Sequence, residues 1–321
     1  MSKGNKMNFR SLRELLLVGV VILLGMIWTI LNPQFLSGNN ISNILRQASY
    51  TAIASVGMTM VIIIGEIDLS AGSLVCASGL AGALICKHTD SVLLAVLGAL
   101  ATGAIVGLAN GTLCAVGKLP GFIASLASMT ILRGLAYIVT GGNSVVWKNE
   151  QFTKIGTGYI GVIPVPVLIM AIVIIFGIVL TTKTRFGRYI YAVGGNIEAS
   201  RWSGLAVVKV KILVYVIMGL LTSISGLIIT ARLGSGQPSA GTGFEMDCIT
   251  AAVVGGTSMS GGRGKVIGTI VGVLLLTVLT NGMTLVGMNT YWQQVLKGVI
   301  IVVSVLVDTR GKSKYLRKRQ C

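Results

Sequence analysis

Residues 183–211 read KTRFGRYIYAVGGNIEASRWSGLAVVKVK and form the long polar interruption near the middle of an otherwise very apolar chain. The stretch carries six basic residues: Lys183, Arg185, Arg188, Arg201, Lys209 and Lys211. Glu198 is its only acidic residue. Hydrophobic runs lie on both sides of it, and basic loops between membrane spans stay on the cytoplasmic side. We therefore expect 183–211 to be a cytoplasmic loop of a membrane protein, open to a cytoplasmic partner.

The composition predicts an all-α polytopic membrane protein. The chain has 321 residues, of which 53% are hydrophobic and 11% are charged, whereas soluble domains carry about 25% charged residues. A segment that crosses a membrane must satisfy its own backbone hydrogen bonds, so the spans are expected to be helices. No polar stretch is long enough to bury the core of a separate soluble domain.

Hydrophobic runs bounded by charged residues, glycine and proline predict about ten spans. They cover residues 15–31, 41–64, 71–86, 91–116, 120–140, 164–182, 210–231, 246–259, 265–286 and 290–307. The segments 71–86 and 246–259 are shorter than the roughly 20 residues that a full crossing needs. We expect these two to be tilted, broken or partly re-entrant.

The distribution of charge orients the spans. The net charge of +17 comes largely from basic residues in the tails and in the 183–211 loop, and such residues are retained in the cytoplasm. This predicts both termini inside, with a cytoplasmic N-tail at 1–14, one transmembrane domain at 15–308 and a basic C-tail at 309–321. The segment 141–163 becomes the longest external loop. Nucleic-acid binding is not expected, because the basic residues follow the membrane edges.

An internal repeat connects two segments in which glycine interrupts the apolar run. Residues 61–72, VIIIGEIDLSAG, align with residues 251–262, AAVVGGTSMSGG. The alignment pairs two glycines and one serine of each copy: Gly65 with Gly255, Ser70 with Ser260 and Gly72 with Gly262. Duplicated halves with glycine-broken spans are typical of transporters.

Two rows of glycine predict closely packed helices. One row is Gly103, Gly107 and Gly111, and the other is Gly264, Gly268 and Gly272. A spacing of four places each row on one helix face, where small residues let two backbones approach closely.

Asp68 is the most notable acid, and it lies in the first glycine-broken segment beside Glu66 and Ser70. A carboxylate inside a membrane costs about 2.5–3.5 kcal/mol on insertion scales, so it faces water, a partner or a pathway. Two compatible roles stay open. Asp68 and Ser70 gate or line a solute path, or one of them caps the following helix by accepting backbone N–H groups. Ser258 and Ser260 are the path candidates of the second copy.

Polar residues also interrupt two of the spans. Gln293, Gln294 and Lys297 lie in the last one. They either line a path for a sugar or another hydroxylated solute or bond to neighbouring helices. Arg133 lies in the span 120–140 and is expected to snorkel outward or to bond to a neighbouring helix.

No catalytic, metal or cofactor site is expected. The phosphate-binding pattern G-x-x-x-x-G-K-[S/T] is not met, so ATP is expected to bind elsewhere than on this chain. The five cysteines form no CxxC pair, and the single histidine, His88, leaves no Ser-His-Asp triad and no histidine metal site.

The central loop contains Glu198, Ala199 and Ser200, followed after three residues by Gly204. This resembles the EAA-xxx-G loop of the permeases of ABC importers, with Ser200 in place of the usual second alanine. In that family the loop forms a short cytoplasmic helix that docks on a separate ATPase subunit.

Longer segments are similar to the ribose-type sugar permeases of that class. Residues 65–73, GEIDLSAGS, resemble the family's GGIDLSVGS, with Glu66 and Ala71 as departures. Residues 187–196, GRYIYAVGGN, resemble its GRYIYALGGN, and the resemblance extends from about Asn32 to Asp308.

The resemblance implies the membrane permease of a bacterial sugar ABC importer, with ribose as the first candidate, in the plasma (inner) membrane. It implies a homodimer or a permease pair, an ABC ATPase subunit, and an extracytoplasmic sugar-binding protein that delivers the sugar to the outer loops. No cofactor is implied. The residues assigned to ATPase coupling are Gly194, Gly195, Asn196, Glu198, Ala199, Ser200 and Gly204.

The residues leave a second hypothesis open, a self-sufficient secondary transporter driven by an ion gradient. Glu66, Asp68 and Lys297 would then be its coupling charges, and this chain alone would transport. A third hypothesis is a structural or signalling membrane protein, in which the polar interruptions only pack helices.

Overall fold

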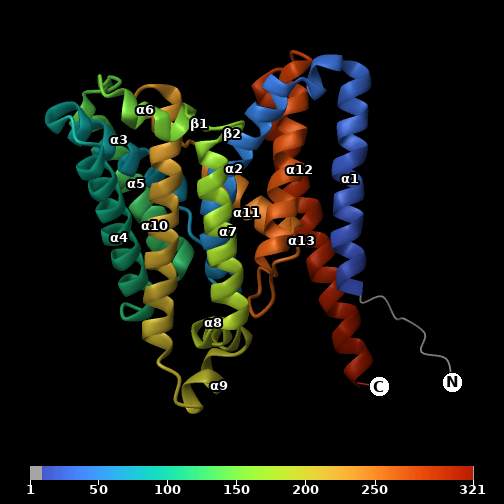
Figure 1. Cartoon of the computed structure of the whole chain (residues 1–321). Helices are drawn as coiled ribbons and strands as arrows, with labels where there is room; N and C mark the ends of the chain where they lie inside the picture. The colour runs from blue at the N-terminus through green and yellow to red at the C-terminus, as the bar shows by residue number, and fades with distance from the viewer. Residues whose placement is uncertain (1–8, 321) are drawn as a thin grey trace.

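The computed structural model describes residues 9–320, and the side chains of residues 16–306 (Figure 1). Residues 1–8 of the N-tail predicted at 1–14, and Cys321, lie outside this part. The described residues form thirteen α-helices, one 3-10 helix and a two-stranded antiparallel hairpin. Their bounds are α1 Phe9–Leu31, η1 Pro33–Leu36, α2 Gly38–Ile63, α3 Ala71–Thr89, α4 Val92–Ala115, α5 Gly121–Thr140, α6 Glu150–Thr157, β1 Tyr159–Ile160, β2 Ile163–Pro164, α7 Val165–Lys183, α8 Arg185–Gly195, α9 Ile197–Trp202, α10 Val207–Leu233, α11 Phe244–Val254, α12 Val266–Leu285 and α13 Thr290–Gln320.

A helix lies on every predicted span: α1 to α5, α7 and α10 to α13. Among the described residues, six helices are long and apolar enough to cross a membrane, namely α3, α4, α5, α7, α10 and α12. The apolar parts of α1 and α13 are shorter, at Leu16–Leu31 and Thr290–Leu306. α2 has 26 residues but carries more polar ones, whereas α11 has only 11 residues, about 16 Å of helix. The expectation of an incomplete span near 246–259 is confirmed, whereas α3 is a continuous helix of 19 residues.

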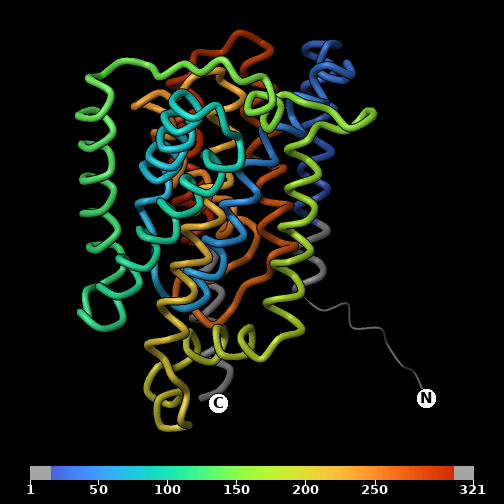
Figure 2. The backbone as a smooth tube through the Cα atoms, turned by 60° about the vertical axis from the view of Figure 1, so that its left-hand side comes forward, coloured from blue at the N-terminus to red at the C-terminus, as the bar shows by residue number. Residues whose placement is uncertain are grey.

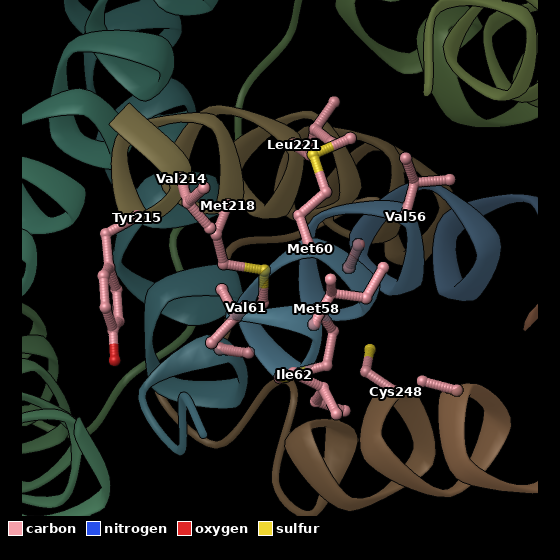
Figure 3. Packing of buried hydrophobic residues seen from close by; sticks show 14 of the residues in the cluster. Val56, Met58, Met60, Val61, Ile62, Val214, Tyr215, Met218, Leu221 and Cys248 are labelled. Atoms are coloured by element: carbon pink, nitrogen blue, oxygen red, sulfur yellow. The ribbon is translucent and has the colours of Figure 1, made fainter. Parts of the chain in front are cut away.

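α2 lies in the core, in contact with α7, α10, α11 and α12. All its residues from Thr51 to Ile63 are buried. Figure 3 shows Val56, Met58 and Met60 of α2 packed between side chains of α10 and Cys248 of α11. Because lipid tails are as apolar as these side chains, close packing rather than removal from water holds such helices together.

The first predicted glycine row packs as expected, against α10. A side chain at Gly103, Gly107 or Gly111 would overlap backbone atoms of α10. In the second row, Gly268 and Gly272 pack in the same way on the backbone of α11. Gly264 does not belong to that helix face, because α12 begins at Val266 and Gly264 precedes it.

Polar segments lie at both ends of the helix bundle. The start of α1, the end of α13 and the short helices α8 and α9 lie at one end (Figure 1), and Figure 2 again shows the segment of α8 and α9 at that end. The segment 141–163, which contains α6 and leads into the β1–β2 hairpin, lies at the other end (Figure 1).

The structure corrects the register of the internal repeat by one residue. After α2 and after α11, three successive N–H groups bond to the carbonyls four, three and five residues back, starting at Ile64 and at Gly255. The left-handed residue of this helix end is Gly65 (φ +83°) in one copy and Gly256 (φ +96°) in the other. Gly65 therefore corresponds to Gly256, and the predicted pairing with Gly255 is wrong. Matching letters missed this, because only the backbone identifies which of two adjacent glycines carries the positive φ.

Candidate functional site

The polar loop of residues 183–211 folds into two short helices, α8 and α9. The Thr184 hydroxyl accepts a hydrogen bond from Gly187 N–H at 3.0 Å and caps α8. Asn196 ends α8 and caps α9, accepting from Ala199 N–H at 2.9 Å. Gly204 follows α9 with φ +79°, a conformation that side chains disfavour. The expected short helix is confirmed.

The outer face of α9 is polar and open. Glu198 and Arg201 form an ion pair at 2.9 Å, and both side chains are largely exposed. Trp202 is 88% exposed, the highest exposure of any aromatic side chain in the described part. Ser200, the departure from the EAA pattern, is buried. Its hydroxyl therefore does not lie on the surface that a partner would contact.

α8 connects α9 to both helix breaks, which are defined here as residues 64–70 between α2 and α3 and residues 255–265 between α11 and α12. Gly194 lies so close to the Ile63 carbonyl and the Gly262 N–H that a side chain there would overlap them. Gly262 N–H in turn donates to the Ile63 carbonyl at 2.8 Å. We call this contact of α8 with the two breaks the junction. Gly195, the next residue, has open space around it.

Tyr191 adds a second attachment between α8 and the second break. Its hydroxyl donates to the Gly264 carbonyl at 2.8 Å. Burial raises the pKa of the Tyr191 hydroxyl, so the proton that makes this bond stays in place across the physiological range.

The first break is held by side chains. Asp68 is buried, and its Oδ1 accepts from Ser70 N–H at 2.8 Å and from the Ser70 hydroxyl at 2.6 Å. These two bonds stabilise the turn that leads into α3. Ser70 is the residue just before the helix, and its own side chain makes no capping hydrogen bond. Asn110 of α4 donates to the Ser70 hydroxyl at 3.1 Å and accepts from Ser128 of α5. Polar side chains therefore connect the break with α4 and α5.

Glu66 has partners that sequence analysis did not find. Its Oε1 accepts from Lys211 at 2.6 Å, and its Oε2 accepts from Gly121 N–H, the first residue of α5, at 2.9 Å. Asp68 is not among them. The pair borders an open pocket of about 440 Å³ whose other wall includes Glu198 and Arg201 of α9. Lys211 lies 145 positions from Glu66, so no local signal predicts this contact.

Backbone contacts are prominent in the second break. Ser258 is buried, and its N–H donates to the Arg263 carbonyl at 2.9 Å, while Ser260 is exposed. Gly261 has φ +78°, and a side chain there would meet the backbone of Gly65. The two breaks therefore touch each other, next to Gly194 of α8.

The segment 234–243 is non-helical and lies against α3. Gly236 contacts Leu80, while Gly241 contacts Gly72 in the first turn of α3. Arg133 of α5 donates to the carbonyls of Pro238 and Ala240 at 2.7 and 2.8 Å. Non-helical backbone is tolerated at membrane depth only where protein satisfies its polar groups. Of the two alternatives for Arg133, snorkelling outward or bonding to a neighbouring helix, the structure shows bonding, although the partner is a non-helical segment.

The predicted polar group of the last span lies elsewhere in the molecule. Lys297 of α13 pairs with Asp247 of α11 at 2.6 Å. Gln293 donates to Thr284 at 3.1 Å, and Gln294 is exposed. The structure thus separates these residues from Asp68 and Ser70, which bond to each other, Ser70 bonding in addition to Asn110 of α4. In the described part of the chain no group of His, Cys, Asp or Glu residues is arranged to hold a metal ion.

Comparisons with known proteins match residues 40–305 to a family described as the permease component of the branched-chain amino acid transport system. The chain is 44% identical over 301 residues to the ribose import permease protein of Escherichia coli, with 92% of each chain covered. It is 44% identical over 296 residues to that of Bacillus subtilis, with 91% of each covered. The xylose transport system permease protein of Escherichia coli is 34% identical over 360 residues, covering 92% of this chain and 91% of that protein. No solved structure matches.

Proposed function

The chain belongs to the family described as the permease component of the branched-chain amino acid transport system, and we propose that it is the membrane permease of an ATP-driven importer for a monosaccharide. The observation that carries this is its identity of 41–44% to ribose import permeases from three bacterial genera, over 91–98% of the chain. Ribose is accordingly the first substrate and xylose the next. The chain is not an enzyme in this scheme, and a separate ABC ATPase subunit hydrolyses ATP.

The proposed topology has ten crossings with both termini in the cytoplasm of a bacterial cell, in the plasma (inner) membrane. It is supported by the common end at which α1 starts, α13 ends and α8–α9 lie (Figure 1). The basic residues of 183–211 would then face the cytoplasm. In this scheme α11 and the segment 234–243 together form one crossing.

The ATPase would dock on α9 and the adjoining end of α8. Glu198, Arg201 and Trp202 offer an exposed polar and aromatic surface. Asn196 begins α9 and Gly204 ends it, which keeps this surface compact. Gly194 and Gly195 stand between the surface and the membrane helices.

The junction suggests how movement of the ATPases reaches the sugar path. Gly194 contacts Ile63 at the end of α2 and Gly262 in the second break, and Tyr191 bonds to the second break. A displacement of α8 would therefore shift the ends of α2 and α11 together. We assign the gate to the two breaks, with Asp68, Ser70, Ser258 and Ser260 as its polar residues.

A sugar-binding protein would dock at the opposite end, on 141–163 and the outer part of 232–245. These segments are tied together, because Val145 and Gly236 exchange two backbone hydrogen bonds of 2.8 Å each. A second copy of this chain or a related permease would complete the channel.

Reconstitution tests the proposal. Purified chain is placed in liposomes with its ABC ATPase, and radiolabelled ribose and the sugar-binding protein are added outside. Uptake is expected only with ATP inside and all three proteins present. Uptake by this chain alone, collapsed by an ionophore, would replace the proposal with an ion-coupled secondary transporter.

A further inference from the structure

An ion pair interrupts the apolar surface formed by α11 and α13. Asp247 lies in the first turn of α11, and Lys297 lies in the second turn of α13. Their charged atoms are 2.6 Å apart, and each side chain remains 26% exposed. Val295 and Val299, on either side of Lys297, are both more than half exposed.

Lipid is an unfavourable neighbour for such a pair. A charged side chain at the bilayer centre costs about 2.5–3.5 kcal/mol even on the most lenient scale. Polar residues within spans accordingly face one another, a partner or a water-filled cavity. The exposed quarter of this pair therefore indicates an aqueous or protein-covered surface.

Polar side chains from two further helices converge on the pair. Gln47 and Thr51 of α2 and Thr277 and Thr280 of α12 line a small pocket with Asp247 and Lys297. The hydroxyls of Thr51 and Thr280 donate to carbonyls of their own helices at 3.3 and 2.9 Å. The oxygen atoms of both hydroxyls can still accept hydrogen bonds, and the neighbouring Lys297 ammonium can donate them.

Resting on the function proposed above, we propose that this cluster is a contact site for the sugar on its way through the permease, which we call the α11–α13 station. A monosaccharide carries neighbouring hydroxyls that both donate and accept hydrogen bonds. A carboxylate, an ammonium, an amide and several hydroxyls match such a ligand. The charges of the pair neutralise each other, so the site selects hydroxyl groups rather than an ion.

The station is closed in this structure. Its cavity is about 20 Å³, enough for a water molecule but not for a sugar. α11 is bounded by non-helical segments on both sides, at 234–243 and 255–265, so it can tilt without breaking a longer helix. The C-terminal end of α11 leads into the second break, which Tyr191 and Gly194 contact. Movement at α8 would thus open the station at Asp247.

The test uses the complete importer in liposomes and measures two quantities: ATP hydrolysis stimulated by the binding protein, and uptake of radiolabelled ribose in competition with 2-deoxyribose and xylose. Asp247→Asn and Lys297→Met are expected to lower ribose uptake at least tenfold and to keep stimulated hydrolysis within twofold of wild type. Gln47→Leu and Thr280→Val leave the ion pair intact and are expected to lower uptake about threefold. They should also change the preference for ribose over 2-deoxyribose. One binding protein serves all variants, so any change in preference belongs to the permease.

Thr250→Val is the matched control, because Thr250 lies on α11, is 1% exposed and bonds to Met246 of its own helix. It is expected to behave as wild type. The double exchange Asp247→Lys with Lys297→Asp distinguishes sugar contact from helix packing. It keeps an ion pair between α11 and α13 but places the carboxylate and the ammonium on the opposite helices. Wild-type uptake and preference in the exchanged variant would overturn the station, as would unchanged preference in Gln47→Leu and Thr280→Val. If the wild-type importer takes up no ribose with ATP, the proposed function itself fails instead.

Discussion

The two helix breaks end their helices in the same way but are anchored by different chemistry. Residues 64–70 and 255–265 both begin with the same three backbone hydrogen bonds and one left-handed glycine. Two carboxylates then hold the first break. Glu66 forms an ion pair with Lys211 and accepts a hydrogen bond from the start of α5, and Asp68 accepts hydrogen bonds from Ser70. Within the described residues, the contacts of the second break to α8 and to the first break run mainly through backbone atoms, at Gly261, Gly262 and Gly264.

This difference suggests a division of labour. The Glu66 carboxylate fixes the first break to α5 and α10 in one geometry, because ion pairs and charge-assisted bonds lose much when they are stretched. Glycine backbone in close contact can shift by small amounts without breaking a side-chain interaction. The first break would therefore be the fixed part of the gate and the second break the moving part.

Gly194→Val is expected to have the largest effect on stability and transport, because it changes the junction of α8 with the two breaks. The new side chain would overlap the Ile63 carbonyl and the Gly262 N–H. Overpacking of this kind costs about 1–3 kcal/mol or more. We expect a lower melting temperature in detergent, measured by intrinsic fluorescence, and loss of transport. Gly195→Ala is the neighbouring control, with nothing within 4 Å of an added methyl group, and equal damage from both variants would contradict the junction.

Glu66→Gln tests the fixed part of the gate. Both side chains of the Glu66–Lys211 pair are 13% exposed, and removing one partner of a well-buried pair costs up to about 3–5 kcal/mol. The residual exposure reduces this to about 2 kcal/mol here. A double-mutant cycle with Lys211→Met in thermal unfolding should give a coupling energy of at least about 1 kcal/mol. Strict additivity of the two single variants would show that the pair contributes nothing.

Gly65→Ala and Gly256→Ala test whether the corrected repeat register is right. Each forces a side chain into a left-handed conformation, φ +83° or +96°, at a cost of about 1–2 kcal/mol. The two melting temperatures should fall by similar amounts. Gly38→Ala, at an open position in the first turn of α2, should leave stability nearly unchanged. A large drop at only one break would argue against equivalent helix ends.

Tyr191→Phe should give the smallest effect, since it removes one hydrogen bond to the Gly264 carbonyl, worth about 1 kcal/mol. We expect normal assembly with the ATPase and a two- to fivefold lower ratio of transport to ATP hydrolysis. The pKa of Tyr191 is raised by burial, so its contribution is complete below the unfolded pKa of about 10 and is lost only above it. The ratio of wild type to variant should hence be constant from pH 6 to 9. A ratio that varies across this range would mean that Tyr191 is not the bonded proton donor.

Local features were predictable, because neighbouring residues carry them. The apolar runs predicted a helix at every span, and the motif at Glu198 predicted the short helix α9. Asn196 and Gly204 end up as its cap and its left-handed turn, as such residues do in many sequences. The shortness of 246–259 predicted the incomplete helix α11.

Errors arose where the answer depends on a distant segment. Arg133 bonds to residues more than 100 positions away, so its sequence context left snorkelling and bonding to a neighbour both open. Asp68 is held by the adjacent Ser70, but Asn110 extends the network to α4. The repeat was misplaced by one residue because two adjacent glycines look alike as letters.

Hydrophobicity, charge placement and short motifs by themselves predicted the class of this protein, the positions of its long helices and the short helix α9, since each depends on residues close in sequence. Only the tertiary structure decided that Glu66 pairs with Lys211, that Lys297 pairs with Asp247, and that α8 joins the two breaks. The physical reason is that every polar group left without a hydrogen-bond partner inside a membrane costs free energy, but several different partners could satisfy the same group. Which partner does so is settled by how the helices pack.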